Sequence, residues 1–230
     1  MEFHNPTFPG QCFFKSILFD SLTPDEIHLM DDVKTEIKYK KGEIICHEGD
    51  EINSFYHLKN GLVKLYKVDK SDKEHIISIA KPFDFIGLLS TFSQTHYQYS
   101  IAAIEDSVFC VFDIKAIKKL VLLNSKFGMA LIENISKITE HVINTRFELN
   151  GKLLRGRIAY ILLYFSQNVY KSNHFELPLS RKEIAELIDM TTENVIRILS
   201  EFRKDQIIKI EGKQIRVLNE DMLRKISVAG

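Results

Sequence analysis

Apolar positions change their spacing along the chain, and each spacing predicts a different kind of element. Between Glu36 and Asp113 they form short β-type runs separated by turn sequences such as Asn60-Gly61. The clearest runs are 62–66, 76–79 and 108–112. Many short strands at this spacing predict a small antiparallel β-roll of the jelly-roll kind.

Between 124 and 150 the spacing becomes helical. Six positions recur at alternating steps of four and three residues: Leu131, Ile135, Ile138, Val142, Thr145 and Leu149. This spacing is found in ordinary amphipathic helices and in two-stranded coiled coils. Because a roll that precedes the helix should have its own core, we favour a dimerisation helix with these six residues at the dimer interface.

The segment after 179 predicts a helix-turn-helix. Ser180-Arg181-Lys182-Glu183 is a capping box that opens a short apolar-faced helix. After a three-residue break, Thr191 can cap a second helix that runs to about Lys204. The β-type runs 207–210 and 214–217 flank Glu211-Gly212 and predict a hairpin wing, with Lys213 at its turn.

The side of the second helix opposite its apolar stripe carries the candidate chemistry. Thr192, Glu193, Asn194 and Arg197 lie there, and Glu193 and Arg197 are four residues apart on one face. Arg can pair with guanine and Glu can accept from the cytosine amino group in the major groove. An ordinary surface ion pair is the alternative, but on this helix base reading is favoured. Ser180, Thr191 and Lys213 complete the candidate DNA contacts.

The charge of the chain is zero overall but divided between its two parts. Residues 1–150 carry 17 basic and 21 acidic side chains, whereas residues 151–230 carry 14 and 10. The C-terminal part is therefore the candidate for phosphate contact. The apolar runs are too short for a membrane span of about 20 residues, and residues 1–11 lack a secretion-signal pattern. We expect a cytoplasmic protein that does not bind a membrane.

Two groups of residues resemble one protein family. Residues 179–185 and 193–199 resemble the winged helix-turn-helix of the cyclic-AMP-receptor/FNR (CRP/FNR) family of bacterial transcription regulators. Residues 41–45, 48–50 and 84–87 resemble the cyclic-nucleotide-binding β-roll of the same family. The pattern and the resemblance predict an α+β protein with a sensor domain at 1–123, a dimerisation helix at 124–150 and a DNA-binding domain at 151–230.

The resemblance also implies what the protein binds. Glu193 and Arg197 match the family's shared base-reading positions, which implies a homodimer on palindromic double-stranded DNA with a TGA-type half-site core. RNA polymerase is an implied partner if the protein activates transcription. The implied effector pocket consists of Phe85, Gly87, Leu88, Leu89, Tyr99 and Ser100.

That pocket lacks the charged anchors of the cyclic-AMP-binding members. Leu88 stands where those members carry Glu, and Tyr99-Ser100 stands where they carry Arg-Ser. Because a neutral side chain cannot replace a charge-assisted contact, we expect that cyclic AMP is not the effector. The identity of the effector stays open.

Other cofactors and functions are less consistent with the sequence. An iron–sulfur cluster needs several N-terminal cysteines, and Cys12 is the one found there. Haem stays an alternative because His47, His57, His75 and His96 lie in or beside the roll, although Leu89 occupies the position of the axial His in a haem-binding relative. A metal-dependent jelly-roll enzyme would need a His-x-His sequence, which the chain lacks, so we expect no enzyme. A regulatory module that acts on a protein partner is the remaining alternative.

Overall fold

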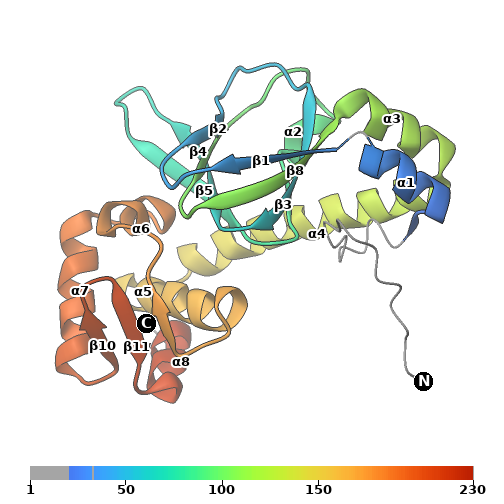
Figure 1. Cartoon of the computed structure of the whole chain (residues 1–230). Coiled ribbons are helices and arrows are strands. Elements are labelled where there is room, and N and C mark those ends of the chain that lie inside the picture. The colour runs from blue at the N-terminus through green and yellow to red at the C-terminus, as the bar shows by residue number, and fades with distance from the viewer. Residues whose placement is uncertain (1–20, 33, 230) are drawn as a thin grey trace, which may run out of the picture.

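The computed structural model describes residues 21–32 and 34–229. Its N-terminal part is a β-roll made of two antiparallel sheets, with strand orders β1-β8-β3-β6 and β2-β7-β4-β5 (Figure 1). The strands are β1 (Thr35–Tyr39), β2 (Ile44–Cys46), β3 (Ser54–Asn60), β4 (Val63–Val68), β5 (Glu74–Ala80), β6 (Phe85–Ile86), β7 (Ser100–Ala103) and β8 (Ser107–Asp113). The helices beside them are α1 (Pro24–Asp32), α2 (Leu88–Thr91) and α3 (Ile114–Leu123). The predicted β-roll is confirmed.

Large aromatic side chains are buried in the core of the roll. Phe55 of β3 and Phe109 and Phe112 of β8 are 0–1% exposed. The Tyr39 ring meets Phe109 edge-on at 5.7 Å. Burial of rings this large contributes strongly to the stability of a roll that is only two sheets thick.

The predicted Asn60-Gly61 turn joins β3 to β4 and requires its glycine. Gly61 has a φ of +91°, which residues with a side chain rarely adopt. A Cβ atom there would lie 2.3 Å from Ser107 Oγ and 2.6 Å from the Asp106 carbonyl oxygen. The close approach of the β7–β8 connection therefore excludes any side chain at 61.

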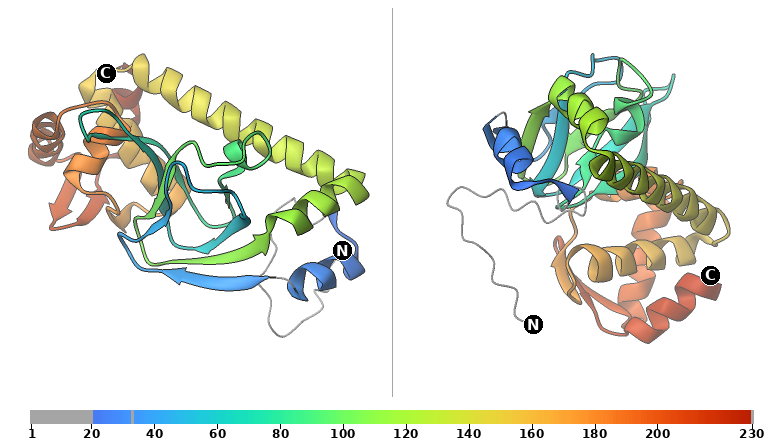
Figure 2. Two further views of the ribbon diagram at one scale, coloured as in Figure 1. Left: turned by 90° about the horizontal axis from the view of Figure 1, so that it is seen from above. Right: turned by 90° about the vertical axis from the view of Figure 1, so that its right-hand side faces the viewer.

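The long helix α4 (Ser125–Asn150) runs along the roll and reaches the C-terminal domain (Figures 1 and 2). It begins at Asn124, whose side-chain oxygen accepts a hydrogen bond from the Phe127 N–H at 3.0 Å. Phe127 and Leu131 are buried in the roll core, and Leu149 is buried in the core of the C-terminal domain. One helix thus belongs to the cores of both domains.

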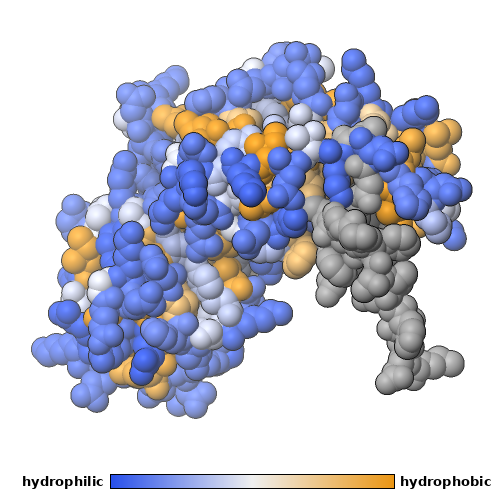
Figure 3. Space-filling view, viewed as in Figure 1, coloured by the Kyte–Doolittle hydropathy of each residue, from blue (hydrophilic) through white to orange (hydrophobic). Residues whose placement is uncertain are grey.

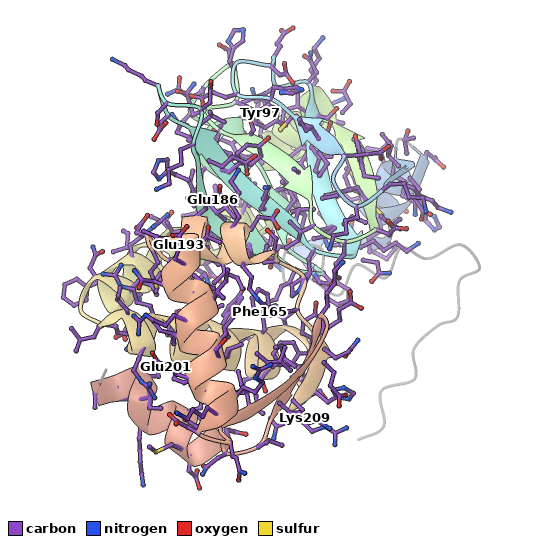
Figure 4. The ribbon with its side chains drawn as sticks, turned by 90° about the vertical axis from the view of Figure 1, so that its left-hand side faces the viewer. Tyr97, Phe165, Glu186, Glu193, Glu201 and Lys209 are labelled. Carbon is purple, nitrogen blue, oxygen red and sulfur yellow. The ribbon has the colours of Figure 1, made fainter. Side chains whose placement is uncertain are left out.

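The C-terminal domain is a helix-turn-helix with a small sheet. Its elements are α5 (Leu154–Tyr164), a π-helical turn η2 (Phe165–Val169), β9 (His174–Glu176), α6 (Arg181–Leu187), α7 (Thr192–Lys204), β10 (Ile208–Glu211), β11 (Gln214–Val217) and α8 (Glu220–Ala229). β10 and β11 form the predicted hairpin, and β9 pairs with β11. Phe165 is 0% exposed at the centre of this domain (Figure 4). The α+β class with a C-terminal winged helix-turn-helix is confirmed.

Candidate nucleic-acid interface

The C-terminal domain, residues 151–230, is called the reader below. The first helix of its helix-turn-helix, α6, begins at the predicted capping box. The Ser180 hydroxyl accepts from the Glu183 N–H at 3.1 Å, and the Glu183 carboxylate accepts from the Ser180 N–H at 2.9 Å. Both bonds satisfy N–H groups that a helix start otherwise leaves unpaired. Ile184, Ala185 and Leu187 are buried against α7 and the domain core. Ser180 itself is exposed at the helix start.

The second helix, α7, presents the predicted polar face to solvent. The Thr191 hydroxyl accepts from the Asn194 N–H at 3.3 Å and caps the helix. Val195, Ile198, Leu199 and Phe202 form the buried stripe at 0–2% exposure. Figure 4 shows α7 as a straight helix with Glu193 near the end beside the roll and Glu201 farther along it. The buried stripe fixes which side chains are free to meet a ligand.

Glu193 and Arg197 are both exposed, but Arg197 has other partners. Its guanidinium donates to Glu201 Oε1 at 2.6 Å and to Asn194 Oδ1 at 3.1 Å. Hydrogen bonds from its own backbone N–H and from the Thr191 hydroxyl lower the pKa of Glu193, so it accepts hydrogen bonds as a carboxylate at neutral pH. The ion pair considered for these two positions therefore forms between Arg197 and Glu201.

Glu201 connects α7 to α5. Arg155 donates to its other oxygen at 2.5 Å and to Asp205 Oδ2 at 3.2 Å, and the Arg155 guanidinium lies 5.0 Å from the Phe202 ring centre. The sequence alone does not reveal this network, because the partners of Arg155 lie 46 and 50 residues away from it in the chain. Arg197 is therefore the last member of a network of ion pairs that runs from Asp205 through Arg155 and Glu201.

The wing and the start of α6 lie close together. Gly212 adopts a φ of +62° at the hairpin turn, and Lys213 follows it, exposed. Ser180, Arg181 and Lys213 line a shallow hollow of about 310 Å³ with Lys41 of the roll. Lys41 donates to the Pro178 carbonyl at 3.0 Å. The hollow therefore gathers Lys41, Arg181 and Lys213 beside the Glu183 carboxylate that caps the start of α6.

The predicted effector pocket is filled by the protein's own side chains. Phe85, Leu88 and Tyr99 are 3–6% exposed in the roll core, and Ser100 Oγ accepts from the Glu48 N–H at 2.9 Å. Gly87 has a φ of +81°, and a Cβ there would lie 2.8 Å from the Tyr97 ring. Leu89 is half-buried at the edge of the same core. These residues do come together, but they pack as core.

The residues considered for cofactors are dispersed. His57 is 1% exposed, lies 4.8 Å from the Phe85 ring, and burial lowers its pKa to about 4. His47 and His96 are exposed in loops, and His75 pairs with Asp69 at 2.8 Å. No group of three or more potential metal ligands occurs within the described residues. Cys12 lies outside them.

Comparisons with known proteins agree with this geometry. Residues 36–124 match the family model of the cyclic nucleotide-binding domain, and residues 156–226 match that of the Crp-like helix-turn-helix domain. The transcriptional activator Anr of Pseudomonas protegens is 26% identical over 99% of this chain and 94% of its own length. FnrA of Stutzerimonas stutzeri is 26% identical over 86% of this chain and 83% of its own. The solved structure of FixK2 from Bradyrhizobium japonicum superposes with a TM-score of 0.78, at 25% identity, over 86% of this chain and 99% of that one.

The chain belongs to the CRP/FNR family. It is a DNA-binding transcription regulator and not an enzyme. Within the described part of the chain, no helix is long and apolar enough to span a bilayer.

In this CRP/FNR regulator a buried lysine joins the roll to the reader. Lys64 of β4 is 8% exposed and contacts Glu74 of β5 at 2.5 Å and Glu183 of α6 at 3.0 Å. Burial alone would lower the pKa of Lys64, but the hydrogen bonds and charges of the two carboxylates outweigh it and raise it. Arg146 of α4 adds a second link, to Asp189 at 3.0 Å. Two acidic residues of the reader, Glu183 and Asp189, thus form ion pairs that hold it against the roll and α4.

Most of the predicted dimer-interface residues face the inside of the protomer. Leu131 and Leu149 are 3% exposed, and Ile135 and Ile138 pack against the roll core. Val142 and Thr145 line a small cavity with Tyr160 and Tyr164. Leu131 and Leu149 therefore offer almost no surface to a second copy. The exposed apolar side chains of α4 are Met129, Ile132, Ile143 and Phe147, at 57–81% exposure.

Proposed function

We propose that the protein is a homodimeric regulator that reads palindromic sites with a TGA-type half-site core. The sensor is placed at residues 1–123, the dimerisation helix at 124–150 and the DNA-binding domain at 151–230. The observation that carries the proposal is the exposed pair Glu193 and Arg197 on a helix whose opposite stripe is fully buried. An exposed polar face on the second helix of a helix-turn-helix fits the major groove.

Each remaining candidate residue has a role in this proposal. Arg197 would leave Glu201 to pair with guanine, at small cost, because an exposed ion pair contributes only about 0.3–0.5 kcal/mol. Glu193 would accept from cytosine, and Thr192 and Asn194 border the same bases. Ser180, Thr191 and Lys213 would contact phosphates.

The dimer is proposed to form through the exposed face of α4. Ile132 and Ile143 are 57% and 60% exposed, and Phe147 is 81% exposed. Apolar side chains at such exposure along one long helix indicate a surface that a second helix covers. Half-buried members of the predicted seam, such as Ile135 and Val142, would border this face.

An effector other than cyclic AMP is proposed, because the packed pocket leaves no charged anchor for a cyclic phosphate. RNA polymerase is the proposed partner at promoters, in line with the activator names of Anr and FnrA. We place the protein in the cytoplasm.

Fluorescence anisotropy with a labelled palindrome tests base reading. Arg197→Ala should remove the preference for the half-site guanine and leave weak non-specific binding, with a loss of about 1–3 kcal/mol for the specific site. Arg203→Ala, which removes an equal charge from the exposed last turn of α7, should keep the preference. An unchanged preference in Arg197→Ala would contradict the assignment. Affinity that does not weaken with salt would favour the protein-partner alternative.

Sedimentation velocity tests the dimer. Ile143→Glu should give monomers, because a charge within an apolar helix pair is left unpaired. The neighbouring exposed residue offers a matched control, since Asn144→Glu introduces the same charge on α4. An intact dimer in Ile143→Glu would refute this interface.

A further inference from the structure

The reader packs against the roll, and we call this position docked. In the space-filling view of Figure 3 the reader lies directly against the roll. Helix α6 contacts β5 there. Six residues of the roll belong to the same buried cluster as the core of the reader: Leu62, Tyr66, Ile76, Ile79, Ala102 and Ile104. A group that is buried where the two domains meet is therefore shielded from water only while the reader is docked.

Glu186 of α6 is a carboxylate that lies buried at this interface. Its side chain is 4% exposed, and Figure 4 shows it where α6 meets the roll. Its Oε1 accepts no hydrogen bond from any described residue. The Lys182 ammonium lies 3.6 Å from that atom, beyond hydrogen-bond length, and its side chain is 73% exposed. An ionised carboxylate is costly here, because burial removes its water without supplying full replacement.

The charges that act on Glu186 come from its own helix and from the roll. They are Lys182 of α6, Lys64 of β4 and Glu74 of β5. Lys64 is already engaged, because it contacts Glu74 at 2.5 Å and Glu183 at 3.0 Å. α7, which also packs against α6, buries an apolar stripe. Three carboxylates thus meet one buried ammonium group, and a proton on Glu186 would relieve the excess negative charge.

Two neighbouring carboxylates of α6 respond to pH in opposite directions. Burial and the charge of Glu74 raise the pKa of Glu186, and Lys182 and Lys64 do not offset them. The pKa of Glu183 is lowered, because hydrogen bonds from the Ser180 N–H and from Lys64 outweigh its burial. A raised pKa means that the docked form binds the proton more tightly than an exposed carboxylate does. The protonated Glu186 therefore favours docking, and this contribution is lost as the pH rises through the raised value.

We propose that Glu186 makes the docking of the reader sensitive to pH: a proton on its carboxylate tightens the docked position, and loss of that proton loosens it. The ionised Glu183 keeps its contact with Lys64 over the same range, so docking is tightest in mild acid. Because the docked reader carries α7, the proton also raises the affinity for DNA. That last step rests on the proposed function; the docking step does not.

Alkylation of a thiol introduced by Ala102→Cys tests the docking step. Ala102 is 5% exposed within the cluster that the roll shares with the reader, so N-ethylmaleimide should reach this thiol when the reader leaves the roll. Adding Glu186→Gln, which is neutral at every pH, should slow alkylation at pH 7.5 at least about threefold. The ratio of the two rates should fall toward one as the pH is lowered to 5. Comparison at equal pH cancels the ionisation of the thiol itself.

Two further variants make the result specific. Glu140→Gln removes an exposed carboxylate of α4 and should leave the alkylation rate of Ala102→Cys unchanged at every pH. Lys182→Gln removes an exposed ammonium that lowers the pKa of Glu186, so it should move the change in rate to higher pH. Peptide mass spectrometry separates position 102 from the native cysteines, and circular dichroism checks that each variant folds.

The outcomes separate the two steps of the proposal. Equal rates with Glu186 and with Glu186→Gln at pH 7.5 would overturn the docking step. A ratio that stays constant with pH would overturn it as well, because the substitution would then act through packing and not through charge. If docking follows pH as expected, equal affinities of the wild type and Glu186→Gln for DNA at pH 7.5 would overturn the regulatory step alone.

Discussion

Replacing Lys64 by methionine should destabilise the protein through the two carboxylates that the change leaves behind. Lys64 contacts Glu74 at 2.5 Å and Glu183 at 3.0 Å. Removing one partner of a fully buried pair costs about 3–5 kcal/mol. Here the carboxylate side chains are 30% and 24% exposed, so water restores part of their solvation. We therefore expect a loss of about 2 kcal/mol in the free energy of unfolding.

A matched control exists on the same strand. Lys67 pairs with Glu48 at 2.9 Å, but both side chains are more than 40% exposed. Lys67→Met should cost less than about 1 kcal/mol, because exposed ion pairs contribute little. Urea denaturation, followed by circular dichroism, measures both variants. Equal losses in the two variants would refute the claim that burial makes Lys64 special.

The pH dependence and a double-mutant cycle sharpen the test. Burial alone would raise the pKa of Glu183, but hydrogen bonds from the Ser180 N–H and from Lys64 outweigh it and lower that pKa in the folded protein. The ionised Glu183 therefore stabilises the fold at neutral pH, and this stabilisation is lost as the pH falls through the lowered pKa. The gap between wild type and Lys64→Met should therefore narrow in acid. Lys64→Met and Glu183→Gln should show a coupling energy of about 1 kcal/mol, whereas zero coupling would place the effect elsewhere.

Three further changes test other parts of the structure. Burial lowers the pKa of His57 from 6.5 to about 4, so stability should fall as the pH drops from 6.5 toward 4, and His57→Gln should flatten that fall in thermal melts at pH 7 and 5. Gly61→Ala should cost more than about 2 kcal/mol in urea denaturation, whereas Gly42→Ala, at a φ of +89° in open space, should cost about 1 kcal/mol. Glu201→Gln should tighten DNA binding about twofold in anisotropy titrations, because Arg197 no longer has to leave a carboxylate; weaker binding would contradict that reasoning.

The reader could be predicted from the sequence because its signals are local. The capping box at Ser180 and the stripe of α7 each depend on residues three or four positions apart, and helix geometry alone brings such residues together. The same holds for the turn at Gly61. β9 has no comparable signal, because it is three residues long and forms only by pairing with β11.

The dimer seam and Lys64 depend on contacts that are distant in sequence. The heptad spacing at Leu131 and Leu149 shows that one face of α4 is covered, but not whether the covering surface is a second copy or the same chain. Lys64 is a charged residue on a strand, and one of its two carboxylate partners, Glu183, comes 119 residues later in the chain. The spacing of apolar residues therefore predicts which positions are buried, but not which part of this chain or of a second copy covers them.

The charge division of the chain gains a physical meaning from these contacts. Of the acidic residues in 151–230, Glu183 and Asp189 pair with Lys64 and Arg146, which lie outside that domain. When the reader is docked, Lys64 of the roll and Arg146 of α4 therefore neutralise two carboxylates that lie near α7. An undocked reader would expose both carboxylates to the phosphates of DNA, which repel them. We therefore expect that a change that weakens the Lys64 contact also weakens DNA binding.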